Sequence, residues 1–297
     1  MMKRRKPKIA LVLGSGGARG LAHIGVIEEL LSRGYDITSV AGTSMGALVG
    51  GIYAAGKLSD FKDWVLGIDK FRMFQLLDFS FRLDGMVKGQ RIISTLKEMV
   101  PDLSIESLSI PFTAISTDMA AEREVVFDRG SLFDAIRASI SLPAFFRPVH
   151  KSDMVLMDGG ILNPLPINRV SRRRGDKVFA VDVNVPDDEK PLPVRRKVQA
   201  EDDDDSTFVE WLKRTFRSDN SDDTKEEPSL YSPYGGSLLQ ASDMMIERIS
   251  RLTVELYKPR LLIEVPAAAY GILEFYRAPE IMELGRAAAA QALDRYE

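Results

Sequence analysis

The chain is 297 residues long, with 45% hydrophobic and 28% charged residues and a formal net charge of −3. This length suits one large α/β domain or two small ones. The absence of cysteine excludes disulfides, thiolate catalysis and cysteine-based metal sites, and the weakly acidic balance argues against a basic face that binds nucleic acid. No segment has the roughly 18 consecutive apolar residues of a membrane span, so we expect a cytoplasmic protein.

Residues 1–7 form a basic tail, and the apolar run that follows it from Ile9 to Leu13 is too short for the core of a signal peptide. Two interpretations of the tail stay open. It is either a solvated extension or a segment with weak attraction to anionic lipid, which would give the protein a peripheral association with a membrane.

The first half of the chain alternates short apolar runs with helical patterns. Residues 8–13 predict a buried strand, a glycine-rich turn follows at 14–20, and residues 21–31 have the periodicity of a helix. A second strand at 36–41 and a second helix at 45–55 repeat the pattern. This order predicts a parallel α/β sheet.

The later elements continue the same class of fold. We predict helices at 90–99 and 132–139, strands at 111–117, 124–127, 154–157, 178–183 and 261–265, and a C-terminal helix that ends near residue 293. The stretch 186–233 interrupts the pattern with acidic and polar runs, so we interpret it as a partly disordered insertion within one domain that spans residues 8–297.

Gly42, Ser44 and Gly46 form a G-x-S-x-G motif between a predicted strand and a predicted helix. A nucleophile elbow needs this context, because the glycines permit a strained turn that lifts the serine hydroxyl clear of the backbone. The start of the helix also favours negative charge beside that hydroxyl. Chance matches on small-residue turns are common, so an ordinary turn is the alternative.

The glycine-rich segment 14–20, GSGGARG, has three interpretations. It differs from a dinucleotide-binding loop by one residue, because Arg19 stands where the third glycine belongs. Gly16 and Gly17, with the adjoining Ala18 and Arg19, can instead direct backbone N–H groups at a developing oxyanion, and the Arg19 side chain can hold the loop or meet a phosphate. The third interpretation is a plain strand-to-helix turn.

Asp158 follows the predicted strand 154–157, and Gly159 and Gly160 let the chain turn away directly after it. A carboxylate at the C-terminal end of a parallel strand lies where α/β active sites are found. An aspartate before glycine is also common in simple turns.

Together these motifs resemble those of the patatin-like phospholipase family. GSGGARG is similar to the family's oxyanion loop, GTSMG (42–46) to its nucleophile elbow and DGG (158–160) to its catalytic aspartate, while ASISLPAFFRP (138–148) resembles the stretch shortly before that aspartate. The resemblance covers residues 8–185 and, more loosely, those from 261 onward. The chain departs from it in the insertion 186–233 and in Ser15, which stands where many members have a third glycine.

The resemblance implies a three-layer α/β/α fold around a mostly parallel sheet, with Ser44 as nucleophile and Asp158 as its base in a Ser–Asp dyad. It implies hydrolysis of lipid or lysophospholipid carboxylic esters, of the phospholipase A or lysophospholipase type, without metal or cofactor. The alternatives are an acyltransferase that uses the same acyl-enzyme and a lipid-binding protein without activity. A Ser–His–Asp triad would need His150 or His23, the two histidines in the chain. Head group, acyl length and oligomeric state stay open.

Two apolar segments outside these motifs also allow two interpretations each. The aromatic stretch 61–81 is either the lining of an acyl-binding cleft or ordinary packing. Residues 208–217, inside the insertion, form either an interfacial helix or a lid packed on the body.

Overall fold

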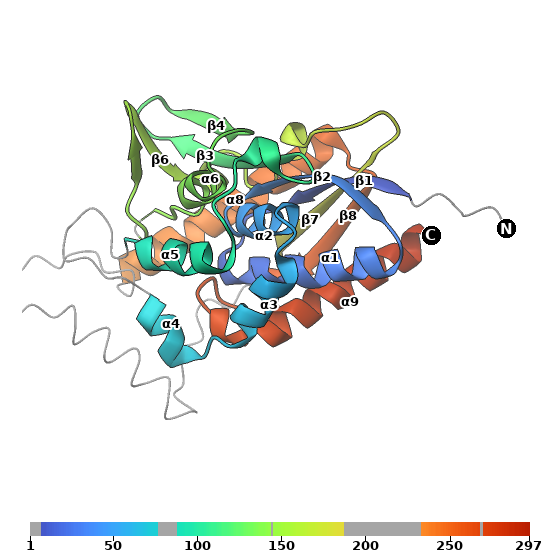
Figure 1. Ribbon diagram of the computed structural model, residues 1–297, viewed down its shortest axis with the longest axis horizontal. Coiled ribbons are helices and arrows are strands. Elements are labelled where there is room, and N and C mark those ends of the chain that lie inside the picture. Colours follow the sequence, from blue (N-terminus) through green and yellow to red (C-terminus); the bar gives the residue numbers. More distant parts are fainter. Residues whose placement is uncertain (1–6, 77–87, 144, 187–232, 268–269) are drawn as a thin grey trace, which may run out of the picture.

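The computed structural model describes residues 7–76, 88–143, 145–186, 233–267 and 270–297 (Figure 1). Nearly all of the basic tail and of the acidic insertion lie outside the described residues, as do Phe79 and Phe81 of the aromatic stretch. The predicted disorder of the insertion and the helix at 208–217 therefore stay predictions.

In the part of the chain that the structure describes, eight strands form one sheet. Hydrogen-bonded pairs connect the strands in the succession β5-β6-β3-β2-β1-β7-β8, and β4 also pairs with β3. The strands β3, β2, β1, β7 and β8 run parallel, whereas β4, β5 and β6 join the sheet through antiparallel pairs. The strands are β1 (Lys8–Leu13), β2 (Asp36–Thr43), β3 (Phe112–Asp118), β4 (Arg123–Phe127), β5 (Val149–Lys151), β6 (Met154–Asp158), β7 (Lys177–Val185) and β8 (Leu261–Pro266).

The central strand β1 shows why helices cover both faces of the sheet. Its side chains alternate between two cores, with Ile9, Leu11 and Leu13 in one and Ala10 and Val12 in the other. The first core also contains the buried faces of α1, α2 and α9, and Val254 of α8 packs against the second. The fold is therefore the predicted three-layer α/β/α arrangement (Figure 1).

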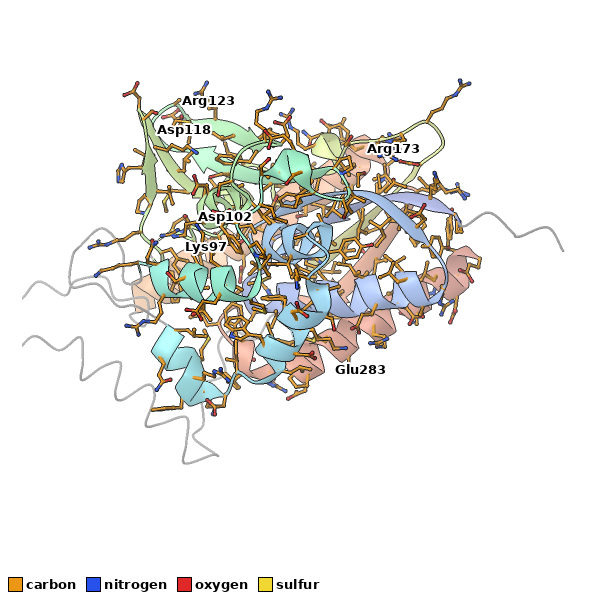
Figure 2. All side chains as sticks on the ribbon, viewed as in Figure 1. Lys97, Asp102, Asp118, Arg123, Arg173 and Glu283 are labelled. Carbon is orange, nitrogen blue, oxygen red and sulfur yellow. The ribbon has the colours of Figure 1, made fainter. Side chains whose placement is uncertain are left out.

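Long and short helices form these outer layers. They are α1 (Ala22–Ser32), α2 (Met45–Ala54), α3 (Leu58–Leu66), α4 (Lys70–Leu76), α5 (Gln90–Met99), α6 (Leu132–Ser139), α8 (Pro233–Tyr257) and α9 (Ala278–Tyr296). Charged side chains such as Arg173 and Glu283 project from the outer surface (Figure 2). None of the helices in the described ranges is long and apolar enough to span a membrane.

Two glycines let α1 and α9 approach each other closely. A Cβ atom on Gly25 would lie 1.9 Å from the Met282 carbonyl oxygen, and one on Gly285 would lie 2.1 Å from the Ala22 carbonyl oxygen. Any side chain at either position would push the helices apart, and the start of α1 lies directly after the glycine-rich loop. This packing therefore helps to fix the loop.

The strands β2 and β6 meet end to end beside β3. Since β4 pairs with β3 over residues 114–118, the other edge of β3 receives both β2 and β6. They arrive from opposite directions, because β2 is parallel and β6 antiparallel to β3; Thr43 pairs with Ile115 and Asp158 with Ser116. The two strands thus end at the same place.

Most predicted elements are present with bounds that shift by one or two residues, but the predicted direction of the strand before Asp158 is wrong. That strand, β6, is antiparallel to its neighbour β3 rather than part of the parallel set. The sequence analysis also did not predict α8 as a helix or β5 (Val149–Lys151) as a strand.

Candidate active site

Ser44 occupies a strained turn between β2 and α2. Its backbone has φ 55° and ψ −122°, a conformation that residues other than glycine rarely adopt. Gly42 and Gly46 make the turn possible, because a Cβ on Gly42 would lie 2.3 Å from the Gly46 carbonyl oxygen and one on Gly46 2.2 Å from that of Leu13. The motif therefore has the backbone geometry of a nucleophile elbow.

Asp158 faces this serine from the end of β6. The Ser44 Oγ donates a hydrogen bond of 2.5 Å to Asp158 Oδ2, and the Gly160 N–H donates one of 2.7 Å to Asp158 Oδ1. Gly159 is needed because a Cβ there would lie 2.3 Å from the Ile115 carbonyl oxygen. The structure thus brings together the two side chains that the sequence singled out, 114 positions apart.

Burial makes the Asp158 carboxylate a stronger base than an exposed one. It raises the pKa of Asp158 from 3.8 to about 6, while the hydrogen bonds from Ser44 and Gly160 oppose the shift. The group is still ionised at neutral pH, and its higher proton affinity suits it to accept a proton from a hydroxyl.

Ser139 and Ser141 bind the backbone N–H groups of Ser44 and Asp158, a role that the sequence did not reveal. The Ser139 Oγ accepts the Ser44 N–H at 2.9 Å and donates to the Ile115 carbonyl oxygen. The Ser141 carbonyl oxygen accepts the Asp158 N–H at 2.9 Å. The one available signal was the family resemblance of the segment 138–148, which does not say what its serines contact.

The glycine-rich loop lies beside Ser44. Only some of the backbone N–H groups predicted as oxyanion donors are free of other hydrogen bonds. The Ala18 N–H donates to the Ile272 carbonyl oxygen at 2.9 Å, so the expectation that Ala18 serves the oxyanion is wrong in this conformation. Within the described residues, the N–H groups of Gly16 and Gly17 have no hydrogen-bond acceptor. Both glycines line the same cavity as Ser44 and Asp158, which favours the oxyanion interpretation over a nucleotide loop.

Three side chains fix the carbonyl groups of this loop. His23 Nε2 lies 2.8 Å from the Gly14 oxygen, Asn184 Nδ2 donates to the Ser15 oxygen at 2.6 Å, and Arg19 Nε donates to the Gly16 oxygen at 3.3 Å. In a planar trans peptide the next N–H points the opposite way, so Gly16 N–H is directed away from Asn184 and Gly17 N–H away from Arg19. Arg19 thus holds the loop through its side chain.

Asn184 was not predicted as a site residue. It ends the apolar run of β7, where the alternating Asp182 and Asn184 are both buried polar residues, and this pattern was the available signal. Its partner Ser15 is distant in the sequence, so only the fold reveals the contact.

Neither histidine joins Ser44 to Asp158, which contact each other directly. His23 is fully buried, and burial lowers its pKa to about 4, so the ring is neutral and bonds the loop backbone. His150 is exposed on β5, where it pairs with Val155. Among the described residues no cluster of three or more His, Asp or Glu side chains could hold a metal ion.

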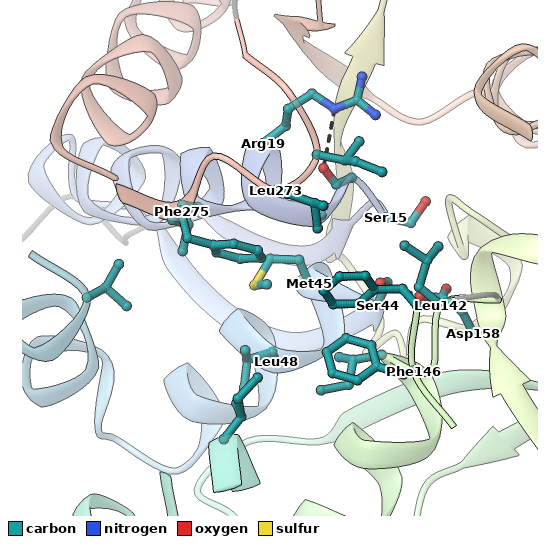
Figure 3. A pocket seen from close by; sticks show the side chains of 18 of the residues that line it. Ser15, Arg19, Ser44, Met45, Leu48, Leu142, Phe146, Asp158, Leu273 and Phe275 are labelled. Atoms are coloured by element: carbon teal, nitrogen blue, oxygen red, sulfur yellow. Dashed lines mark hydrogen bonds between the residues drawn. The ribbon is translucent and has the colours of Figure 1, made fainter. Parts of the chain in front are cut away.

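An apolar cavity of about 130 Å³ opens beside Ser44 (Figure 3). Its walls come from α2, α3, α5 and the segment 138–148, with side chains that include Met45, Leu48, Phe61, Trp64, Leu96 and Phe146. The aromatic stretch is thus divided: Phe61 and Trp64 line the cavity, whereas Phe71 on α4 is 69% exposed.

A serine on a strained elbow, bonded to a buried carboxylate in an α/β/α fold, is an arrangement typical of serine hydrolases. Residues 11–170 match the model of the patatin-like phospholipase family. The chain is 35% identical over 342 residues to an uncharacterized NTE family protein of Mycobacterium tuberculosis, covering 98% of this chain and 92% of that one. The chain belongs to the patatin-like phospholipase family.

Two animal relatives match over a shorter part. The Drosophila melanogaster protein named neuropathy target esterase sws is 33% identical over 187 residues, which is 61% of this chain and 13% of that protein. The Mus musculus patatin-like phospholipase domain-containing protein 7 is 37% identical over 188 residues, 61% of this chain and 14% of that one. The family relationship supports lipid hydrolase activity in general.

Proposed function

We propose that the chain is a serine-dependent lipid acyl hydrolase of the phospholipase A or lysophospholipase type, with Ser44 as nucleophile and Asp158 as base. The observation that carries this proposal is the direct hydrogen bond between the two side chains at the wall of an apolar cavity. The names of the animal relatives, an esterase and a phospholipase domain protein, agree with it.

Each step of the reaction has a group in the structure. Ser44 Oγ attacks the ester carbonyl carbon while Asp158 takes its proton, and the N–H groups of Gly16 and Gly17 stabilise the oxyanion. The bond to the alcohol then breaks, and the proton on Asp158 passes to that alcohol. Water attacks the acyl-enzyme, its proton moves through Asp158 to Ser44, and the fatty acid leaves.

The apolar lining of the cavity supports an ester with a long acyl chain. Leu48 and Phe61 line it together with other apolar side chains, and Ser44 and Asp158 are among its polar lining residues. Burial of each CH₂ group of a chain contributes about 0.8 kcal/mol, so an apolar cavity favours longer acyl chains over shorter ones for as long as the added groups are buried in it.

Contact with a lipid surface is part of the proposal. Phe71 is largely exposed on α4, and Met73 and Leu76 of the same helix line the cavity. An exposed phenylalanine on this helix is suited to enter the boundary between lipid head groups and acyl chains. The substitution Phe71→Ser should reduce sedimentation with phosphatidylcholine vesicles and leave hydrolysis of a water-soluble ester unchanged.

The proposal is tested with lysophosphatidylcholine, phosphatidylcholine and triacylglycerol that carry the same acyl chain. Mass spectrometry of the products should show free fatty acid from at least one of them, with a loss of about three orders of magnitude or more for Ser44→Ala. A second arm adds glycerol as acceptor, since an acylated acceptor in place of free acid would indicate the acyltransferase. Undiminished hydrolysis by folded Ser44→Ala would overturn the proposal.

A further inference from the structure

The hydroxyl of Ser15 is buried in the active site without a partner. The residue is 3% exposed, it lines the cavity together with Ser44 and Asp158, and its Oγ has no hydrogen-bond partner among the described residues (Figure 3). A buried hydroxyl left unsatisfied costs free energy, so its presence calls for a reason.

The backbone of Ser15 holds this hydroxyl in place from both sides. The Ser15 N–H donates to the Pro164 carbonyl oxygen at 2.9 Å, and the Ser15 carbonyl oxygen accepts from Asn184 Nδ2. Ser15 is therefore tied to the segment that follows Asp158 as well as to β7. Its N–H is also committed, which leaves the side chain as the group that can act.

The Ser15 hydroxyl lies beside the catalytic carboxylate. A Cβ atom placed on Gly160 would be 3.1 Å from Asp158 Oδ1 and 3.2 Å from Ser15 Oγ, so the two oxygens border the same small space. The next two residues pack elsewhere, since a Cβ on Gly16 would meet Val183 and one on Gly17 would meet Ile272. Ser15 Oγ thus lies on the side of the base.

We propose that Ser15 is a catalytic residue whose hydroxyl binds the oxygen that leaves in acylation and enters in deacylation. The proposal rests on the proposed function. The leaving alcohol and the attacking water use the same position beside Asp158, because Asp158 gives a proton to the first and takes one from the second. A hydroxyl can donate to the developing alkoxide and accept from the water.

In deacylation every bond and proton can be followed. One O–H of the water points at Asp158 and the other at Ser15 Oγ, so a lone pair of the water faces the acyl carbon. The bond from water oxygen to acyl carbon forms, the bond from that carbon to Ser44 Oγ breaks, and the water proton passes through Asp158 to Ser44. Ser15 ends the cycle unchanged.

The test separates the two half-reactions with p-nitrophenyl butyrate, whose leaving group needs no proton. For Ser15→Ala and Ser15→Gly, the burst of p-nitrophenolate should keep its rate within about threefold, while steady-state turnover falls about 10- to 100-fold, the effect of one hydrogen bond to a reacting group. Intact-protein mass spectrometry should then show butyryl-enzyme in the steady state. The glycine variant should fold, since it removes no side-chain hydrogen bond of Ser15.

Equal losses in burst and steady-state rate would overturn the proposal and place Ser15 among the oxyanion donors, and no loss in either would give it no catalytic role. Ser15→Thr, which keeps the hydroxyl, should retain more turnover than Ser15→Ala. The variant Ser44→Ala tests the proposed function independently of Ser15. If it abolishes the burst while Ser15→Gly deacylates normally, the proposed function stands and only the role of Ser15 fails.

Discussion

Replacement of Asp158 by Asn should stabilise the protein while it abolishes activity. Asn has the same shape as Asp, and its amide can accept from Gly160 and donate to Ser44, so both hydrogen bonds of the site can persist. Burial raises the pKa of Asp158 from 3.8 to about 6, which means that the folded state binds more protons than the unfolded state between these values. Stability conferred by this group is therefore present at low pH and is lost as the pH rises through this window.

The size of the effect follows from the shift. About two pKa units, at about 1.4 kcal/mol each, correspond to about 3 kcal/mol of unfolding free energy. The free energy of unfolding of both proteins is measured with urea from pH 3.5 to 7.5. The difference between Asp158→Asn and the native sequence should grow by about 3 kcal/mol in favour of the variant as the pH rises over that range.

A matched control is Asp182→Asn. Asp182 is buried on β7, and burial raises its pKa to about 6 as well, but it does not contact Ser44. Its variant should show a similar change of stability with pH and a much smaller loss of activity. A stability difference for Asp158→Asn that is independent of pH, or that falls as the pH rises, would refute the raised pKa of Asp158.

Other consequences concern activity. The kcat/KM for an uncharged ester should rise through pH about 6, because ionised Asp158 accepts the Ser44 proton; a profile flat from pH 4 to 8 would contradict this role. Asn184→Leu should lower kcat about 10- to 100-fold with little change in KM, since it releases the peptide unit that directs Gly16 N–H; an unchanged kcat in the folded variant would remove Asn184 from the oxyanion loop's support. His23→Gln and His150→Gln should each retain activity within about tenfold, and a loss of several orders of magnitude in either folded variant would favour a triad.

Local patterns were enough to predict the parts of the site that local geometry determines. The elbow at Ser44 follows from two glycines four positions apart and from the strand and helix that flank them. The apolar run of β1 and the helical periodicity of α1 likewise place the glycine-rich loop at the end of a strand.

The direction of β6 could not be predicted, because its apolar run suits a strand of either direction. The direction is set by a tight turn at Ser152 and Asp153, where Lys151 pairs with Met154 and Ser152 has a φ of 53°. The turn returns the chain along β5, and Asp158 therefore reaches Ser44 from the opposite end of β3.

The supporting residues depend on contacts between distant parts of the chain. Ser139 and Asn184 look like ordinary polar residues in their own segments, and each acts on a backbone group far away in the sequence. The same holds for Ala18, whose N–H meets the Ile272 carbonyl oxygen and so leaves the set of candidate donors. Such pairings follow from the packing of the whole sheet.

The most direct test of the Ser44–Asp158 dyad is covalent labelling with a fluorophosphonate, followed by peptide mapping. The dyad predicts one adduct, on the peptide that contains Ser44, with no adduct in Ser44→Ala and strongly slowed labelling in Asp158→Asn, because the serine proton then lacks its acceptor. An adduct on a different residue, or rapid labelling of Ser44 in folded Asp158→Asn, would contradict it.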